Sequence, residues 1–377
     1  MSDLELSSED SLRLNVLLAQ KPQAVRIDES KMIVYALTDK GEASVPLNPT
    51  GRDDRYLRTV RELLSMHTLG SPRGYPVYIT RWTRMGQERD NNALHNLLLL
   101  GEPEAVVAVV HAPGLTTELA RLAWWAMPEA EHARRMLAHP VVLESELAQE
   151  LAQFLIEYLP FETEPKAILD SVRLILQPGL ISDEEKQTLW NRANRKGTYY
   201  VSFLQAMPET LPEQGAAHPD RVQLESVLEG LLAEQNPYAQ LLCKALSPMG
   251  QVFLQTTEAA MDKLADEATS VALFEVIGKF FAAARPKGAQ CADSEAAVAH
   301  AEVCVADPEV AAPGLAEVLA AVPEQRHHLV AMLALSFAGE NLLDTFFSHS
   351  DTVGSLMRRK LSPWTAPMLE QIRVLRR

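Results

Sequence analysis

Length, composition and charge exclude several classes of protein at once. The chain has 377 residues, of which 47% are hydrophobic and 23% are charged, the usual balance of a globular protein with a substantial core. Its 50 acidic residues outnumber its 35 basic ones and give a formal net charge of −15 at pH 7, which argues against general affinity for nucleic acid or anionic membranes. The longest apolar runs, such as 97–100 and 106–110, are far shorter than the roughly 20 residues that cross a bilayer, so we expect no membrane contact.

The N-terminus and the cysteines both indicate a cytoplasmic protein. Residues 1–10 are acidic and lack the basic and apolar regions of a secretory signal. Cys243, Cys291 and Cys304 form no CxxC pair and are too few for a disulfide framework, which is typical of a reducing compartment. We therefore expect a cytoplasmic location and free thiols.

Residues 1–90 predict a small α/β module with a short antiparallel sheet. Glu9 and Asp10 suit the first turn of a helix, where the dipole favours acidic side chains. Short alternating runs joined by polar turns then predict a meander of strands. The predicted elements are a helix from about residue 8, strands at 24–27, 31–37 and 43–47, a helix over 53–66 and a fourth strand over 77–82.

Residues 91–210 predict a stack of helical hairpins, because short apolar helical runs alternate there with proline corners. Thr116, Thr163 and Ser182 are the expected N-caps, with Ser182 in a capping box. Pro128 is expected at the first position of a helix. The corners are unevenly spaced, which favours degenerate HEAT-like pairs over a strict repeat; an ordinary irregular helical domain is the alternative.

Two adjacent tryptophans support the stacked arrangement. Trp124 and Trp125 lie on the same predicted helix, where neighbouring side chains point about 100° apart. Both can be packed only if that helix has neighbours on two sides.

The segment 208–220 has three prolines and few apolar residues, so it predicts a linker or a long surface loop. Helical patterns resume over 221–377, with a polar break at 284–293. The predicted fold class is therefore mainly α, with HEAT-like stacked helical hairpins after a small N-terminal α/β module.

Several motifs carry a family likeness, at residues 69–78, 81–86, 98–105, 122–128 and 158–165. Through them the chain resembles the DsrS family, whose members are soluble proteins encoded beside reverse-type dissimilatory sulfite reductase in sulfur-oxidising bacteria. The resemblance runs over roughly residues 10–212 and weakens beyond. It implies a cytoplasmic role in the oxidation of stored sulfur, in support or control of the sulfite reductase system, and it brings no catalytic residues.

A basic and aromatic group forms the first candidate binding site. Arginines can hold phosphates while aromatic rings stack on unpaired bases, so this group suits RNA or a protein partner. The alternative is a sheet edge whose arginines pair with the acids of this chain. The group comprises Arg73, Tyr75, Tyr78, Arg81, Trp82 and Arg84.

Cysteine persulfide chemistry is the enzymatic alternative that the sulfur setting suggests. Cys291 lies in the polar break beside Arg285 and Lys287, where exposure and positive charge would favour the thiolate. Cys243 is the second candidate thiol, whereas Cys304 fits a helical core position. The alternative for each cysteine is an unreactive thiol.

No other catalytic or metal-binding pattern occurs. The sequence has no GxSxG, P-loop, HExxH or GxGxxG motif, and the spacing of His300 and Cys304 matches no established metal site. We therefore expect a non-enzymatic accessory protein without a cofactor or bound metal, acting through contacts with a protein of the sulfite reductase system. The alternatives are an RNA-binding regulator and a persulfide sulfur carrier.

Overall fold

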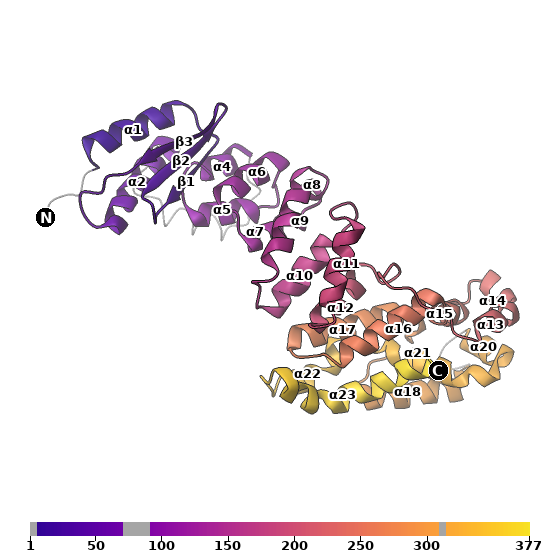
Figure 1. The fold of residues 1–377 in the computed structure, drawn as a ribbon. Helices are drawn as coiled ribbons and strands as arrows, with labels where there is room; N and C mark the ends of the chain where they lie inside the picture. Colours follow the sequence, from indigo (N-terminus) through magenta and orange to yellow (C-terminus); the bar gives the residue numbers. More distant parts are fainter. Residues whose placement is uncertain (1–5, 71–90, 309–313) are drawn as a thin grey trace. The chain divides into compact units, whose positions relative to one another are not determined.

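The computed structural model describes residues 6–70, 91–308 and 314–377 (Figure 1). Over these ranges the chain is mainly α-helical, with one small antiparallel sheet near the N-terminus. This confirms the predicted mainly helical class. No helix within the described ranges combines the length and the apolar character that crossing a bilayer demands.

Backbone contacts divide the chain into two compact units, Met1–Tyr158 and Leu159–Arg377. The sequence predicts boundaries near residue 90 and within the linker after residue 210, and these stay predictions. The predicted fourth strand at 77–82 lies outside the described residues.

The N-terminal unit begins with the predicted meander. Three strands pair antiparallel in the order β1-β2-β3, with Tyr35 of β2 opposite both Arg26 and Ser44. Leucines of the first helix and of the second pack with Val25, Val34 and Val45 of the sheet in one core. The elements are α1 (Ser8–Ala19), β1 (Ala24–Asp28), β2 (Ile33–Thr38), β3 (Gly41–Pro46) and α2 (Asp53–Leu69).

Asp10 joins three parts of this module. Its side chain is fully buried, and its Oδ2 accepts hydrogen bonds from the Asn48 backbone N–H (2.7 Å) and the Tyr56 hydroxyl (2.5 Å). Burial alone would raise the pKa of Asp10, but the hydrogen bonds from Tyr56 and Asn48 outweigh it and lower that pKa. The residue therefore ties α1 to the turn after β3 and to α2.

Short helices complete the N-terminal unit. The sheet is joined to them by a hydrogen bond from the Val25 N–H to the Leu98 carbonyl (2.8 Å). Within this series α5 packs on α6 and α7, and α7 packs on α9. The helices are α4 (Asn91–Leu97), α5 (Pro103–Val110), α6 (Thr117–Ala126), α7 (Ala130–Leu137), α8 (Pro140–Leu143) and α9 (Leu147–Tyr158).

The two tryptophans of α6 do have neighbours on two sides. Trp124 is buried, donates to Glu150 (2.7 Å) and meets the Phe154 ring edge to face. Trp125 donates to Glu42 (3.0 Å) and lies beside the Arg26 guanidinium. The helix is thus held between α9 and the sheet.

The regular secondary structure of the C-terminal unit consists of helices in its described residues. Helix α12 packs against α10, α16 and α17, and α21 packs against α17, α18 and α23 (Figure 1). Its longer helices are α10 (Pro165–Ile175), α11 (Asp183–Arg192), α12 (Gly197–Ala206), α15 (Pro237–Ala245), α16 (Pro248–Met261), α17 (Glu267–Phe280), α18 (Ser294–Ala306), α21 (Arg326–Ser336) and α23 (Gly354–Val374). Shorter helices are α13 (Arg221–Val227), α14 (Glu229–Ala233), α20 (Leu315–Ala321) and α22 (Asp344–Phe347).

The predicted helix starts are confirmed in part. Thr116 caps α6 and Ser182 forms a complete capping box on α11. Thr163 is not a cap, because Pro165 takes the first helical position and Glu164 precedes it. Pro128 does not begin a helix either, since the Glu129 N–H turns back to the Met127 carbonyl (3.0 Å) and α7 starts at Ala130.

A close backbone approach fixes α17 against the end of α21. A Cβ placed on Gly278 would lie 1.9 Å from the Ala338 carbonyl oxygen, so only glycine fits there. The Arg285 guanidinium donates to the carbonyls of Ser336 (2.5 Å) and Ala338 (3.2 Å). These bonds satisfy acceptors that a helix end leaves open.

Gly278→Ala is therefore expected to destabilise the C-terminal unit by about 3 kcal/mol, because the obstructing atom is backbone and cannot rotate away. Gly230→Ala is the matched control, since a Cβ there meets nothing within 4 Å. In helix α14 it should stabilise by roughly 0.5–1 kcal/mol. Urea unfolding of the two variants tests this, and equal midpoints would contradict the close approach.

Candidate functional site

The predicted basic and aromatic group lies outside the described residues. Its six members, Arg73, Tyr75, Tyr78, Arg81, Trp82 and Arg84, all fall within 71–90. Their use in RNA or partner binding stays a prediction.

The two candidate thiols are half-buried. Burial raises the pKa of Cys291, Asp293 and Cys304 add to that rise, and Arg285 opposes it. Arg285 itself is engaged with the carbonyls of Ser336 and Ala338. The local setting therefore disfavours the thiolate, contrary to the environment that the sequence predicted for Cys291.

Cys243 has a similar setting, and Cys304 is a core residue. Burial raises the pKa of Cys243, with Glu225 adding to the rise. Cys304 is 2% exposed and shares a face of α18 with the buried Ala297 and Ala301, as predicted. Among the described residues no group of three or more His, Cys, Asp or Glu side chains is placed to hold a metal ion.

A surface feature of the C-terminal unit follows residues 208–215, which we call the connecting segment. These residues form the first part of the link between α12 and α13 and have no regular secondary structure. Glu209 in this segment pairs with Lys244 (2.7 Å), and Glu213 accepts from Gln255 (3.3 Å). A Cβ on Gly215 would lie 2.6 Å from the Val252 Cγ2, so the segment runs directly against α16. These contacts hold the connecting segment against α15 and α16.

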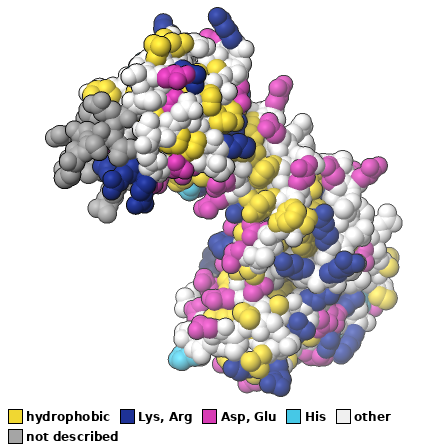
Figure 2. All heavy atoms as spheres, turned by 60° about the vertical axis from the view of Figure 1, so that its left-hand side comes forward, with side chains coloured by type: hydrophobic (Ala, Val, Ile, Leu, Met, Phe, Trp, Pro, Cys, Tyr) yellow, Lys and Arg dark blue, Asp and Glu magenta, His cyan; other side chains and the backbone are white. Residues whose placement is uncertain are grey.

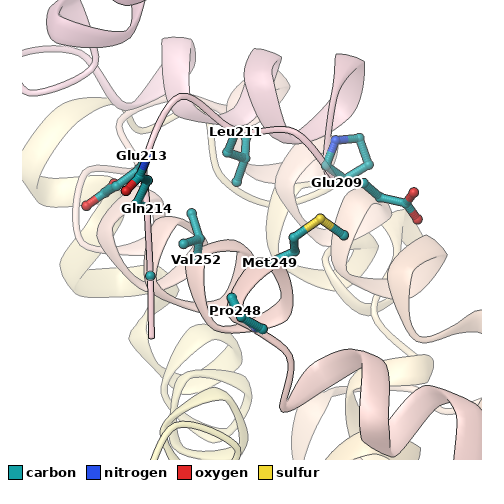
Figure 3. A pocket seen from close by; sticks show the side chains of 9 residues that line it. Glu209, Leu211, Glu213, Gln214, Pro248, Met249 and Val252 are labelled. Carbon is teal, nitrogen blue, oxygen red and sulfur yellow. The ribbon is translucent and has the colours of Figure 1, made fainter. Parts of the chain in front are cut away.

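Beneath the connecting segment lies a hollow of about 310 Å³, which we call the Met249 hollow. Leu211 descends from the segment toward Val252 and Met249 of α16, and Glu209 and Glu213 stand at its two ends (Figure 3). Met249 is 46% exposed, a high fraction for a large apolar side chain beside an apolar wall. The full lining is Pro208, Glu209, Leu211, Glu213, Gln214, Gly215, Pro248, Met249 and Val252.

The two carboxylates of the Met249 hollow differ in their partners: Glu209 is paired with Lys244, which lies outside the lining, whereas Glu213 accepts from the neutral amide of Gln255. The lining contains these two carboxylates and no lysine, arginine or histidine. The hydrogen bond and the charge of Lys244 lower the pKa of Glu209, so this carboxylate is ionised at neutral pH. An apolar floor beside the Glu213 carboxylate, whose hydrogen-bond donor is the neutral Gln255 amide, suits a segment that is itself apolar and carries a basic residue.

Two further hollows border the same segment. One, of about 460 Å³, includes Lys244, Lys279 and Phe280; the Phe280 ring stacks on Phe253 with centroids 4.0 Å apart, and the Lys244 amine lies 4.8 Å from its centroid. The other, of about 530 Å³, lies toward α11 and includes Asp183 and Lys186. Both contain basic side chains, which distinguishes them from the Met249 hollow.

Charges elsewhere are mixed. On the face shown in Figure 2, basic and acidic side chains are interspersed over the described residues without a broad patch of one sign. This face therefore offers no extended electrostatic track of the kind that single-stranded nucleic acid follows.

The sequence reasoning identified the connecting segment as a loop but did not identify the hollow. Leu211 is an apolar residue among prolines and glutamates. It is the local indication that this loop packs against another part of the protein. Met249 and Val252 are about 40 residues further along, and nothing in a linear pattern brings them to the loop.

The comparisons with known proteins give no match to a family model, a curated protein or a solved structure. The site therefore has to be interpreted from its own geometry.

Because the pKa values of Cys243 and Cys291 are raised, each has less thiolate at pH 7 than the same cysteine in the unfolded chain. Iodoacetamide should then alkylate both more slowly in the native protein than in urea, as followed by peptide mass spectrometry. Faster alkylation of native Cys291 would contradict this and return persulfide chemistry to first place.

Proposed function

We propose that this protein is a non-enzymatic accessory protein that captures a protein partner through the Met249 hollow. The bound part of the partner is an apolar segment that carries a lysine or arginine. The proposal rests on one observation: an apolar floor with a half-exposed methionine lies between two carboxylates and has no basic side chain in its lining.

The physical argument comes from each part of that lining. Methionine has a flexible and polarisable side chain, and it is favoured on surfaces that accept varied apolar groups. The Glu213 carboxylate at one end attracts a basic residue and so fixes the register of the bound segment, while Glu209 at the other end is paired with Lys244. The connecting segment is anchored at Glu209, Glu213 and Gly215, so little ordering entropy is lost when a partner binds.

The resemblance to the DsrS family supplies the biological setting of this proposal. From this resemblance we propose that the protein acts in the cytoplasm of a sulfur-oxidising cell and that its partner belongs to the reverse sulfite reductase system. We further propose that the helical pairs form degenerate HEAT-like hairpins, whose stacking gives the connecting segment its support.

Two alternative functions remain proposals. RNA binding depends on Arg81, Trp82 and their neighbours, which lie outside the described residues. A persulfide carrier depends on Cys291 or Cys243, whose raised pKa values count against it.

Met249→Lys tests the proposal, because it replaces the apolar side chain with a positive charge that repels a basic segment, at a position exposed enough to accept it. Capture of the partner from lysate by the tagged protein should fall by about tenfold, equivalent to about 1.4 kcal/mol. Quantitative mass spectrometry of the captured proteins gives the measurement.

Val303→Lys is the matched control, since Val303 is an apolar residue of α18 that is 65% exposed and lies outside this hollow. It should leave capture unchanged. Equal capture by both variants and the wild type would reject the Met249 hollow as the docking site. Loss of the captured proteins on nuclease treatment would instead favour the RNA alternative.

A further inference from the structure

Three histidines of the C-terminal unit lie together, and the proposed function does not use them. The rings of His218 and His328 meet edge to face with centroids 5.4 Å apart, and those of His327 and His328 lie 4.1 Å apart. His218 lies in the link between the connecting segment and α13, whereas the other two lie in the first turn of α21. We call these three residues the histidine cluster.

Two of the three rings are buried. His218 is 5% exposed and His328 is 1% exposed, while His327 is exposed. The His218 Nε2 and both ring nitrogens of His328 make no hydrogen bond of ordinary length and angle with the described residues. Such a ring is tolerated in the core only while it is neutral, because an imidazolium loses far more hydration on burial than a neutral imidazole.

The turn that carries His218 is attached at two places. At one, the His218 N–H donates to the carbonyl of Leu246 at the end of α15 (3.0 Å). At the other, the side-chain amide of Gln325, directly before α21, donates to the Asp220 carboxylate (3.2 Å). There the His218 ring also packs on the His328 ring. The attachment to α21 therefore depends on contact between two imidazoles.

The environment of His328 favours its neutral form. Burial, His327 and His218 lower the pKa of His328 from 6.5 to about 4, while a weaker contact with the Val374 backbone and the charge of Asp220 act in the opposite direction. The ring is therefore neutral at pH 7.

The charged side chains of the other helices around α21 are paired elsewhere or exposed. Lys244 of α15 pairs with Glu209. Arg373 and Arg376 of α23 pair with Glu258. The response of the cluster to pH therefore depends on its own rings and on Asp220. The exposed charged residues on or next to these helices are Glu267, Glu275, Lys279, Glu295, Glu302, Glu324, Arg326, Arg358, Arg359, Lys360 and Glu370.

We propose that the histidine cluster is a proton-sensitive lock, which holds the turn at His218 against α21 at neutral pH and releases it in mild acid. Protonated rings in contact repel one another, and a charge on His328 is costly because the ring is buried. The His218 Nδ1 lies 3.9 Å from the Asp220 Oδ2, so a protonated His218 has a partner within its own turn. The bond to Leu246 involves no titrating group and remains.

The direction of the pH effect follows from the lowered pKa of His328. This pKa is about 4 in the folded chain and 6.5 without the burial and the neighbouring charges, so the folded chain binds the proton more weakly. The stabilisation is complete above pH 6.5 and is lost progressively as the pH falls toward 4. From pH 7 to pH 5 the equilibrium constant for opening should rise about twentyfold.

Hydrogen exchange of the full-length protein at pH 7 and pH 5 tests the proposal. Mass spectrometry follows peptides that cover residues 216–228 and 325–336, with a correction for the intrinsic pH dependence of exchange. The wild type should show the rise of about twentyfold in opening. His328→Leu, which is similar in size and cannot be charged, should show a rise of less than about threefold. His328→Gln is a second variant without a titrating group and should behave in the same way.

His300→Leu is the matched control, since His300 is a half-buried histidine of α18 whose ring contacts Phe337. It should keep the wild-type rise. The proposal is overturned if the wild type shows no rise over 216–228, or if both His328 variants rise as much as the wild type. Capture through the Met249 hollow is measured at pH 7, where the cluster is neutral, so the two proposals fail separately.

Discussion

The close contact between Gly278 and the Ala338 carbonyl is the constraint on which the rest of the C-terminal unit depends. It brings α17 onto the end of α21 at backbone distance, and Arg285 then satisfies the carbonyls of Ser336 and Ala338. With one face of α17 fixed in this way, Val276 and Phe280 on the other side become walls of a hollow along the connecting segment. A surface built on rigid helices and crossed by one anchored loop presents its side chains with little rearrangement.

Local chemistry explains how much of the fold the sequence could predict. Thr116 and Ser182 cap helices because their hydroxyls reach backbone N–H groups three residues on, which depends on no distant residue. The meander was equally predictable, since polar turns and short alternating runs fix its order and register. Thr163 failed as a cap because Pro165 competed for the helix start.

Tertiary contacts set the limit of such prediction. Asp10 fits the first turn of α1 by its charge, yet its main role is to accept hydrogen bonds from Asn48 and Tyr56, 38 and 46 residues away. Gly278 also has no local feature within its helix that predicts its close contact with the Ala338 carbonyl. The candidate site follows the same rule, because the Met249 hollow joins a loop to a helix. The basic group of 73–84 was the most visible pattern in the sequence, and the described residues do not include it.

The most direct test of the central claim is site-specific photo-crosslinking from position 249 in cells of the source organism, with the crosslinked peptides identified by mass spectrometry. Docking in the Met249 hollow predicts crosslinks to one apolar segment that contains lysine or arginine, and these should persist after nuclease treatment. The same photoreactive group at position 303 should give no such crosslink. Crosslinks from position 249 confined to this chain, while a partner is still captured, would contradict the account.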